Sequence, residues 1–158
     1  MDLTTSGVKS GCKLPLDILP ATPTWTIEFQ VSISPSQVNT YWFIIAVHKN
    51  HNDSSNMASQ TFNLHEFPAN GAVYMNDAVG CVSFQPNLPR GQYMAMRFVK
   101  DAVNFTLYID GVQRAQTLSS NVTFGNVLGD EGIRLGHSMG PAAIVASYKN
   151  FKIYDHAV

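Results

Sequence analysis

The sequence has few charged residues and no long apolar run. Charged residues make up 13% of its 158 residues, about half the ~25% of an average globular domain, which argues against long charged surface helices and coiled coils. The longest purely apolar run, Trp42–Val47, has six residues, whereas a membrane-spanning helix needs roughly 20. The ten Lys and Arg residues form no cluster, so the sequence does not supply the many cations with which proteins neutralise duplex nucleic acid.

Cysteine is also scarce, with only Cys12 and Cys81. One disulfide between them and two buried free thiols are both compatible with the sequence. Aromatic residues, Asn, Ser and Thr are abundant, and this mixture suits neutral polar partners better than ionic ones. A chain of this length buries roughly 68–70% of its unfolded surface, so we expect residues 1–158 to form a single domain.

Apolar residues recur mostly at every second position, which is typical of half-buried β-strands. The clearest example is Trp25–Ile33, where five apolar residues alternate with polar ones between Pro23 and Pro35. The segment Tyr41–His48 is apolar on both faces and predicts a central strand covered from both sides. Shorter strands are expected at Thr61–His65, Ala72–Asn76, Cys81–Phe84 and Gly132–Gly136.

The C-terminal half contains the most specific local signal. Asp110-Gly111 separates two alternating runs and predicts a two-residue hairpin turn, because both central positions of such a turn take positive φ. Gln92–Val103 fits a helical period as well as a strand, and we favour a strand from its context. The last strand is expected at Ile144–Tyr154, although Ala142–Phe151 also fits a helical period. There, we place Phe151 and Ile153 on one face and Tyr148, Lys152 and Tyr154 on the other.

About ten short strands without crossover helices predict an all-β fold, an antiparallel β-sandwich. Five segments in order also resemble the concanavalin A-like superfamily, and within it the laminin-G-like domains: Trp25–Ile33, Arg97–Asp101, Phe105–Gly111, Ile133–Gly136 and Tyr148–Asp155. The resemblance implies a concanavalin A-like jelly roll of two curved sheets. Members of this family commonly bind carbohydrate, some bind protein, and some are hydrolases.

The carboxylates give little support for hydrolysis. Glycosidic cleavage by a retaining enzyme needs two carboxyl groups about 5–5.5 Å apart. The three glutamates are Glu28, Glu66 and Glu131, and none has a second carboxylate two residues away. We therefore expect that the chain is not an enzyme. A hydrolase with an unfamiliar pair such as Glu28 and Asp77 is the least favoured alternative.

Metal binding has only weak candidates. His48 and His51, beside Asn52 and Asp53, have a spacing that zinc ligands use, but an exposed polar loop explains them better. Calcium fits this fold class more readily, because it takes oxygen ligands. The candidate calcium ligands are Asp53, Asp77 and Asp130. We expect no required cofactor and leave calcium open.

Sugar binding needs aromatic faces for the ring and planar polar groups for the hydroxyls. Trp42, Tyr74 and Tyr93 are candidates for stacking, although Trp42 also fits a core position. His48, Asn76, Asp77 and Arg97 are candidates for hydrogen bonds. Trp25, Phe29, Phe105 and Phe151 we assign to the core.

These observations predict a non-catalytic, lectin-like adhesion module that binds a glycan. We expect it outside the cell or on a virion, as part of a larger multidomain or multimeric assembly such as a phage tail component that binds host glycans. The alternative is a structural or protein-binding laminin-G-like module, in which sheet edges or a sheet face mediate assembly. Nucleic acid and membrane insertion are not expected.

Overall fold

The structure is a computed structural model that describes residues 3–5, 12–14, 18, 20, 22–36, 42–48, 60–67, 72–77, 79–84, 88–122, 133–138 and 145–158. The elements are β1 (Leu3–Thr5), β2 (Cys12–Leu14), β3 (Trp25–Ile33), β4 (Trp42–His48), β5 (Gln60–Phe67), β6 (Ala72–Asp77), β7 (Cys81–Phe84), β8 (Tyr93–Lys100), β9 (Asn104–Ile109), β10 (Val112–Leu118), a 3-10 turn η3 (Ser119–Asn121), β11 (Ile133–Ser138) and β12 (Ala146–Tyr154). None of the helices in these ranges is long and apolar enough to cross a membrane.

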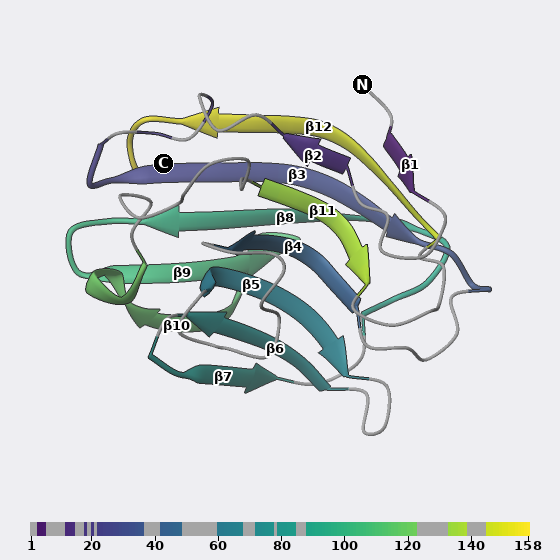
Figure 1. Cartoon of the computed structure of the whole chain (residues 1–158), viewed down its shortest axis with the longest axis horizontal. Helices are drawn as coiled ribbons and strands as arrows, with labels where there is room; N and C mark the ends of the chain where they lie inside the picture. Colours follow the sequence, from purple (N-terminus) through teal and green to yellow (C-terminus); the bar gives the residue numbers. More distant parts are fainter. Residues whose placement is uncertain are drawn as a thin grey trace.

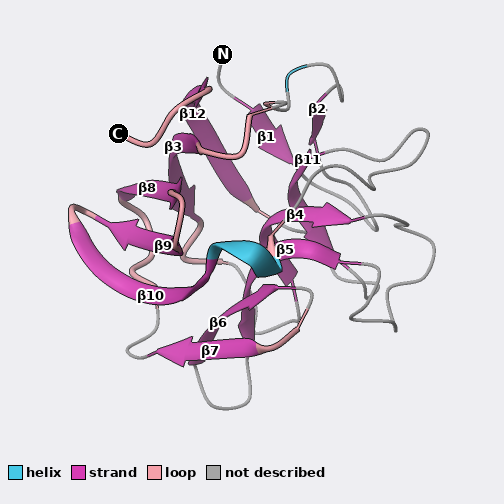
Figure 2. Cartoon of the chain, turned by 90° about the vertical axis from the view of Figure 1, so that its left-hand side faces the viewer, coloured by secondary structure: helices cyan, strands magenta, loops and turns pink. Residues whose placement is uncertain are grey.

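The strands form two six-stranded sheets that pack face to face (Figures 1 and 2). The first sheet has the order β1-β12-β3-β8-β9-β10, and the second has the order β2-β11-β4-β5-β6-β7. Every pair of neighbouring strands in the two sheets runs antiparallel. The predicted antiparallel β-sandwich is confirmed.

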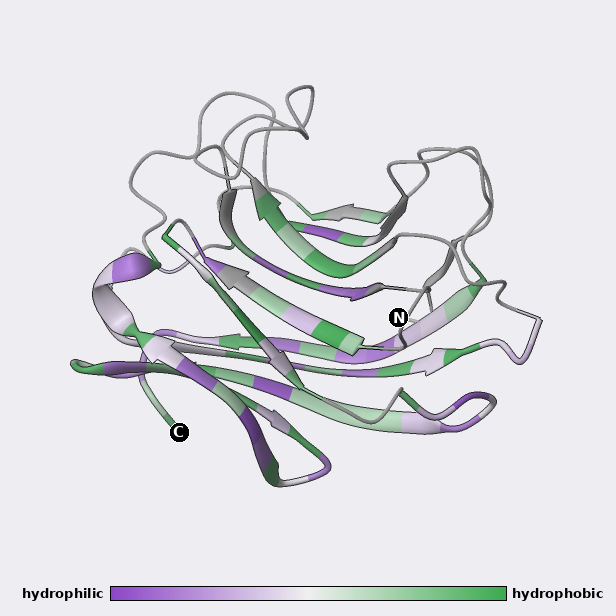
Figure 3. Ribbon diagram, turned by 90° about the horizontal axis from the view of Figure 1, so that it is seen from below, coloured by the Kyte–Doolittle hydropathy of each residue, from purple (hydrophilic) through white to green (hydrophobic). Residues whose placement is uncertain are grey.

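β3 shows why the sheets pack in this way. Its five apolar residues are at most 2% exposed, whereas Glu28, Gln30 and Ser32 on the opposite face are half-buried. Successive side chains of a strand point to opposite faces, so the alternation in the sequence becomes one core face and one outer face. Figure 3 shows hydrophobic and hydrophilic residues alternating along the strands.

A cluster of aromatic rings fills the core between the sheets. Phe62 of the second sheet lies 5.0 Å from Phe105, 5.8 Å from Trp25 and 5.4 Å from Phe98, measured between ring centroids. These rings come from strands of both sheets, so they hold the two layers together. The core positions predicted for Trp25, Phe29 and Phe105 are confirmed, while Phe151 is half-buried and stacks on Phe29 at 5.9 Å.

The predicted hairpin is confirmed residue for residue. β9 ends at Ile109 and β10 begins at Val112. Asp110 and Gly111 between them have φ of 51° and 77°, the positive values that this turn requires. Gln92–Val103 contains the strand β8 rather than a helix, because pairing with β3 and β9 on both sides outweighs its helical propensity.

The predicted orientation of Tyr148 is wrong. The ladder between β12 and β3 is shifted between Lys149 and Lys152, where Asn150 takes a φ of 56°. An extra residue in a strand reverses which face the following side chains occupy. Tyr148 therefore shares the core with Phe151. It is 1% exposed, and its hydroxyl donates a hydrogen bond to the carbonyl oxygen of Ile44 at 2.9 Å.

The two cysteines lie on opposite edges of the second sheet. Cys12 lies on β2 and Cys81 on β7. Five strand spacings of ~4.8 Å separate these strands, about 24 Å in all, whereas a disulfide requires Cα atoms within ~7 Å. The disulfide alternative is therefore excluded. Cys81 is exposed and Cys12 is half-buried, so neither is a fully buried thiol.

Asp77 at the end of β6 joins the edges of the two sheets. Its Oδ1 accepts hydrogen bonds from the backbone N–H groups of Val79 and Gly80 at 2.8 and 2.7 Å. Its Oδ2 accepts one from the Thr117 hydroxyl on β10 at 2.7 Å and one from Asn121 Nδ2 in η3 at 3.2 Å. Figure 2 shows η3 in this position, between β10 and the second sheet.

The hydrogen bonds to Asp77 predict acid-dependent stability. Burial raises the pKa of Asp77, but these bonds outweigh burial and hold the pKa below its usual value. The ionised form thus stabilises the fold above the usual carboxyl pKa, and this stabilisation is lost as pH falls through the lowered pKa. We expect Asp77→Ala to lower the free energy of unfolding by about 2–3 kcal/mol at pH 7, measured by urea denaturation.

The matched control is Asp155→Asn at the exposed chain end, whose carboxylate contacts only His156 among the described side chains. It should unfold at nearly the wild-type urea concentration. Equal urea midpoints for Asp77→Ala and the wild type would show that Asp77 does not hold the sheet edges together.

Candidate functional site

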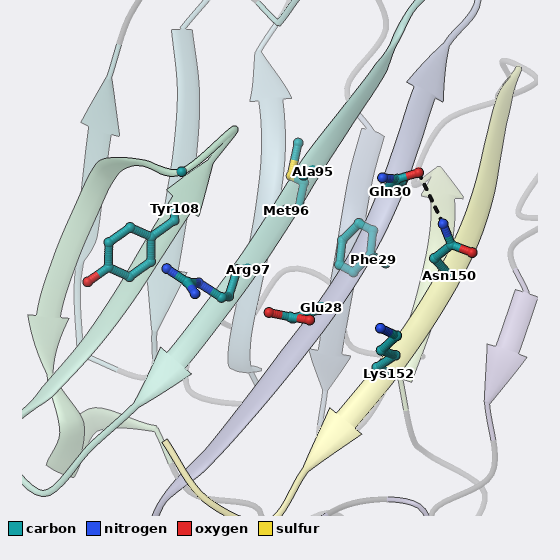
Figure 4. A pocket seen from close by; sticks show the side chains of 10 residues that line it. Glu28, Phe29, Gln30, Ala95, Met96, Arg97, Tyr108, Asn150 and Lys152 are labelled. Atoms are coloured by element: carbon teal, nitrogen blue, oxygen red, sulfur yellow. Dashed lines mark hydrogen bonds between the residues drawn. The ribbon is translucent and has the colours of Figure 1, made fainter. Parts of the chain in front are cut away.

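A hollow of about 510 Å³ opens on the outer face of the first sheet (Figure 4). Its walls come from β3, β8, β9 and β12, and Gly111 of the hairpin turn lies at its rim. The volume falls within the roughly 300–1,000 Å³ that small-molecule sites occupy. Six of the lining side chains carry a polar or charged group: Glu28, Gln30, Arg97, Tyr108, Asn150 and Lys152.

The strand register places four of these side chains in one line across the sheet. Lys152 on β12 lies opposite Glu28 on β3. Glu28 lies opposite Arg97 on β8, which lies opposite Tyr108 on β9. Directly paired residues share a face, so this line of side chains follows from the same alternation that buries the core residues of β3 and β8.

The hollow exists because Ala95 is small. Ala95 lies opposite Gln30, two residues before Arg97 on the outer face of β8. Asp110 fixes the neighbouring turn against it, since Ala95 N–H donates to Asp110 Oδ1 at 2.8 Å and Asp110 N–H donates to the Ala95 carbonyl at 2.9 Å. Gly111 at the rim has no side chain. A larger side chain at position 95 would project into the hollow.

The polar groups of the hollow are only partly satisfied by one another. Tyr154 donates a hydrogen bond to Glu28 Oε2 at 3.3 Å, and Asn150 Nδ2 donates to Gln30 Oε1 at 3.2 Å. The guanidinium carbon of Arg97 lies 4.7 Å from the centroid of the Tyr108 ring. Within the described part of the chain, neither Arg97 nor Lys152 has a carboxylate within 4.0 Å. The hollow therefore presents donors and acceptors on a fixed framework.

Two of the predicted sugar-binding residues belong to this face. Arg97 lines the hollow, and Tyr93 lies two residues before Ala95 on the same side of β8. Tyr93 is 42% exposed, and Lys149 Nζ lies 3.7 Å from its ring centroid. One face of the Tyr93 ring is therefore occupied by an ammonium group.

The other five predicted sugar-binding residues belong to the second sheet. Trp42 and His48 lie at the two ends of β4 and Asn76 lies on β6, but their side chains are outside the described residues. Tyr74 is half-buried on β6, and Asp77 is taken up by the hydrogen bonds between the sheet edges. The structure therefore divides the seven residues between two sheets and does not bring them into one site.

A polar and aromatic cluster that the sequence did not single out surrounds His65 on the second sheet. His65 Nδ1 lies 2.9 Å from Asn63 Oδ1. Its ring stacks on Tyr74 at 5.2 Å between centroids and meets Phe43 edge-on at 5.6 Å. Asn63 is 0% and His65 6% exposed. Burial lowers the pKa of His65 to about 4, so the imidazole is neutral near pH 7.

Among the metal and hydrolase candidates, only Glu28 and Asp77 have described side chains. Asp53, Asp130 and His51 lie outside the described residues. Among the residues that are described, no group of three His, Cys, Asp or Glu side chains could hold a metal ion. Glu28 lines the hollow on the first sheet while Asp77 joins the sheet edges, so this carboxylate pair is not assembled.

Sequence reasoning missed most of the hollow. Alternation alone already placed Glu28 and Gln30 on the polar face of a strand. It did not indicate which residues lie beside them, because the pairing of β12, β3, β8 and β9 is set by contacts between distant segments. Asn150 was not assigned to a site because its position depends on the bulge in β12.

The neutral state of His65 makes a prediction about pH. Between about pH 6.5 and pH 4 the unfolded chain takes up a proton on this imidazole and the folded chain does not. Stability should therefore fall by up to roughly 3 kcal/mol as the pH is lowered through this window. Urea denaturation at several pH values measures it, and His65→Gln should remove this part of the slope. An imidazole resonance of His65 that titrates near pH 6.5 by NMR would contradict the prediction.

Comparisons with known proteins show the fold. No family model matches the sequence, and no curated protein matches it. Among solved structures, it resembles Trypanosoma rangeli sialidase with a TM-score of 0.72 and 14% identity over 99% of this chain. It also resembles domain 4 of an extracellular GH43 arabinanase from Geobacillus stearothermophilus in complex with arabinotriose (TM-score 0.62, 14% identity, covering 99% of this chain and 83% of that one). A galectin of Caenorhabditis elegans matches with a TM-score of 0.53 and 9% identity, covering 94% and 96% of the two chains.

The expectation that the chain is not an enzyme is contradicted by its similarity to several structures of Trypanosoma rangeli sialidase, with TM-scores of 0.70–0.72 and 13–14% identity. The chain spans about a quarter of the length of these sialidase chains, with 25% covered. Part of a sialidase, one domain of an arabinanase and a galectin thus share this fold. The chain has the concanavalin A-like β-sandwich fold that the sequence predicted.

Proposed function

We propose that the chain is a carbohydrate-binding domain and that the hollow on the first sheet holds the sugar. The observation that supports this most strongly is the lining of the hollow. One carboxylate, two amides, an arginine and a lysine surround a space closed on one side by a tyrosine. Their proximity is fixed by the pairing of four strands, so the groups are positioned before any ligand arrives.

The chemistry of the lining matches a polyhydroxylated ligand. Sugar hydroxyls both donate and accept hydrogen bonds at close spacing. Glu28 only accepts, Arg97 and Lys152 only donate, and the amides of Gln30 and Asn150 do both. An apolar ligand would bury these groups without compensation, which costs free energy for every unpaired polar or charged group. A sugar replaces the water on each of them with a hydroxyl.

The structural neighbours support the same class of ligand. The matched arabinanase domain is in complex with arabinotriose, and a sialidase of which this chain matches about a quarter is in complex with sialic acid. The proposal concerns binding at the hollow, and it holds whether or not a longer protein containing this domain cleaves glycans. We also propose that the domain acts outside the cell or on a virion, where several copies would raise the avidity of weak individual sites.

A steric substitution tests the proposal. Ala95→Tyr should fill the hollow, and the fold should tolerate it because Ala95 is exposed and tyrosine is favoured in strands. We expect the affinity for any glycan that the wild-type chain retains on a glycan array to fall at least about tenfold, the effect of losing ~1.4 kcal/mol. Isothermal titration calorimetry with that glycan measures it.

The matched control is Val99→Tyr, which adds the same ring four residues further along the outer face of β8, outside the hollow. It should bind like the wild type. Retention of no glycan by the wild type across the array, or equal affinity of Ala95→Tyr and wild type, would contradict the proposed function.

A further inference from the structure

Arg97 is held in a fixed orientation but is not neutralised. Its guanidinium lies over the Tyr108 ring at 4.7 Å, an arrangement in which cation–π attraction orients the planar group. No described carboxylate lies within 4.0 Å of it, and no described acceptor takes a hydrogen bond from it. From this arrangement, and resting on the proposed function, we infer that Arg97 binds the carboxylate of an acidic sugar.

Glu28 does not neutralise Arg97, although it is the cross-strand neighbour. The two residues are directly paired between β3 and β8, a position in which opposite charges normally attract. In Figure 4 the Arg97 side chain extends toward Tyr108 and away from Glu28. The Glu28 carboxylate instead accepts a hydrogen bond from Tyr154 on the β12 side. The N–H groups of Arg97 are therefore left for a ligand.

Lys152 supplies a second cation on the opposite side of the hollow. It is two strands away from Arg97 in the same line of paired residues, which is about 10 Å at ~4.8 Å per strand. With Arg97, Lys152 and Glu28 the hollow carries a net charge of +1, while the whole chain carries −1. The local field in the hollow thus favours an anionic ligand over a neutral one.

A planar carboxylate fits the fork of Arg97 better than a hydroxyl does. Arginine donates two parallel hydrogen bonds to a carboxylate, and such charge-assisted pairs are about twice as strong as neutral ones. The Glu28 carboxylate and the amides of Gln30 and Asn150 then remain for the ring hydroxyls. The ligand that satisfies the whole lining is a saccharide with one carboxylate and several hydroxyls, such as a uronic or a sialic acid residue.

Matched pairs of ligands test this inference. Each uronic or sialic acid oligosaccharide is compared with its carboxyl-reduced counterpart, which has the same ring and linkages but no charge, by isothermal titration calorimetry. We expect reduction to weaken binding to the wild-type chain about 10- to 100-fold, the effect of one charge-assisted hydrogen-bonded pair. Arg97→Gln should bind both members of a pair equally. Arg97→Lys keeps the charge but loses the fork, so it should recover only part of the difference.

The control variant is Arg114→Gln on β10, which removes the same charge outside the hollow and should keep the wild-type preference. Equal binding of the two members of every pair, with loss of both in Ala95→Tyr, would overturn the acidic-sugar inference and leave the proposed function standing. A sulfated neutral sugar that binds as tightly as the carboxylated one would show simple charge attraction and overturn the carboxylate assignment. Failure of both members of every pair to bind would overturn the acidic-sugar inference, and the proposed function would fall with it only if the wild-type chain retained no glycan on the array.

Discussion

Aromatic packing between the two sheets is the interaction on which the rest of the structure depends. Phe62 from the second sheet contacts Trp25, Phe98 and Phe105 from three strands of the first sheet. Each of these rings is at most 1% exposed, and burying such rings supplies much of the free energy that holds a small sandwich together. The contact also fixes the register, because a shift of one residue would turn every ring outward.

The packing of this core determines which side chains lie on the outer face of the first sheet. Because Phe98 and Met96 point inward, Arg97 and Ala95 must point outward. The neighbouring strands β3 and β9 determine which side chains lie beside them. The hollow is therefore a consequence of core packing together with one small residue, Ala95. Side chains at outward positions of paired strands can change by substitution without disturbing the rings beneath, which is consistent with a fold that also occurs in a galectin, in domain 4 of an arabinanase and in part of a sialidase at 9–14% identity.

The sequence predicted those features that depend on neighbours along the chain. The alternation of Trp25–Ile33 and the Asp110-Gly111 turn are local patterns, and both occur where they were expected. Tyr148 was misplaced because the bulge at Asn150 reverses the faces of β12, and no local signal marks it. The hollow and the His65 cluster combine residues from strands far apart in the chain. Their pairing could not be obtained from one sequence, so Arg97 was singled out without Glu28, Lys152 or Tyr108.

We propose that the sugar binds to the outer face of the first sheet rather than to that of the second. Chemical-shift mapping by NMR on the ¹⁵N-labelled chain tests this most directly, with titration of a glycan that the chain binds. Binding at the hollow should shift the amide signals of Gln30, Ala95 and Tyr108 and the side-chain Nε–H signal of Arg97, while the signals of β5 and β6 should not move. Shifts confined to β5 and β6, around His65 and Tyr74, would contradict it.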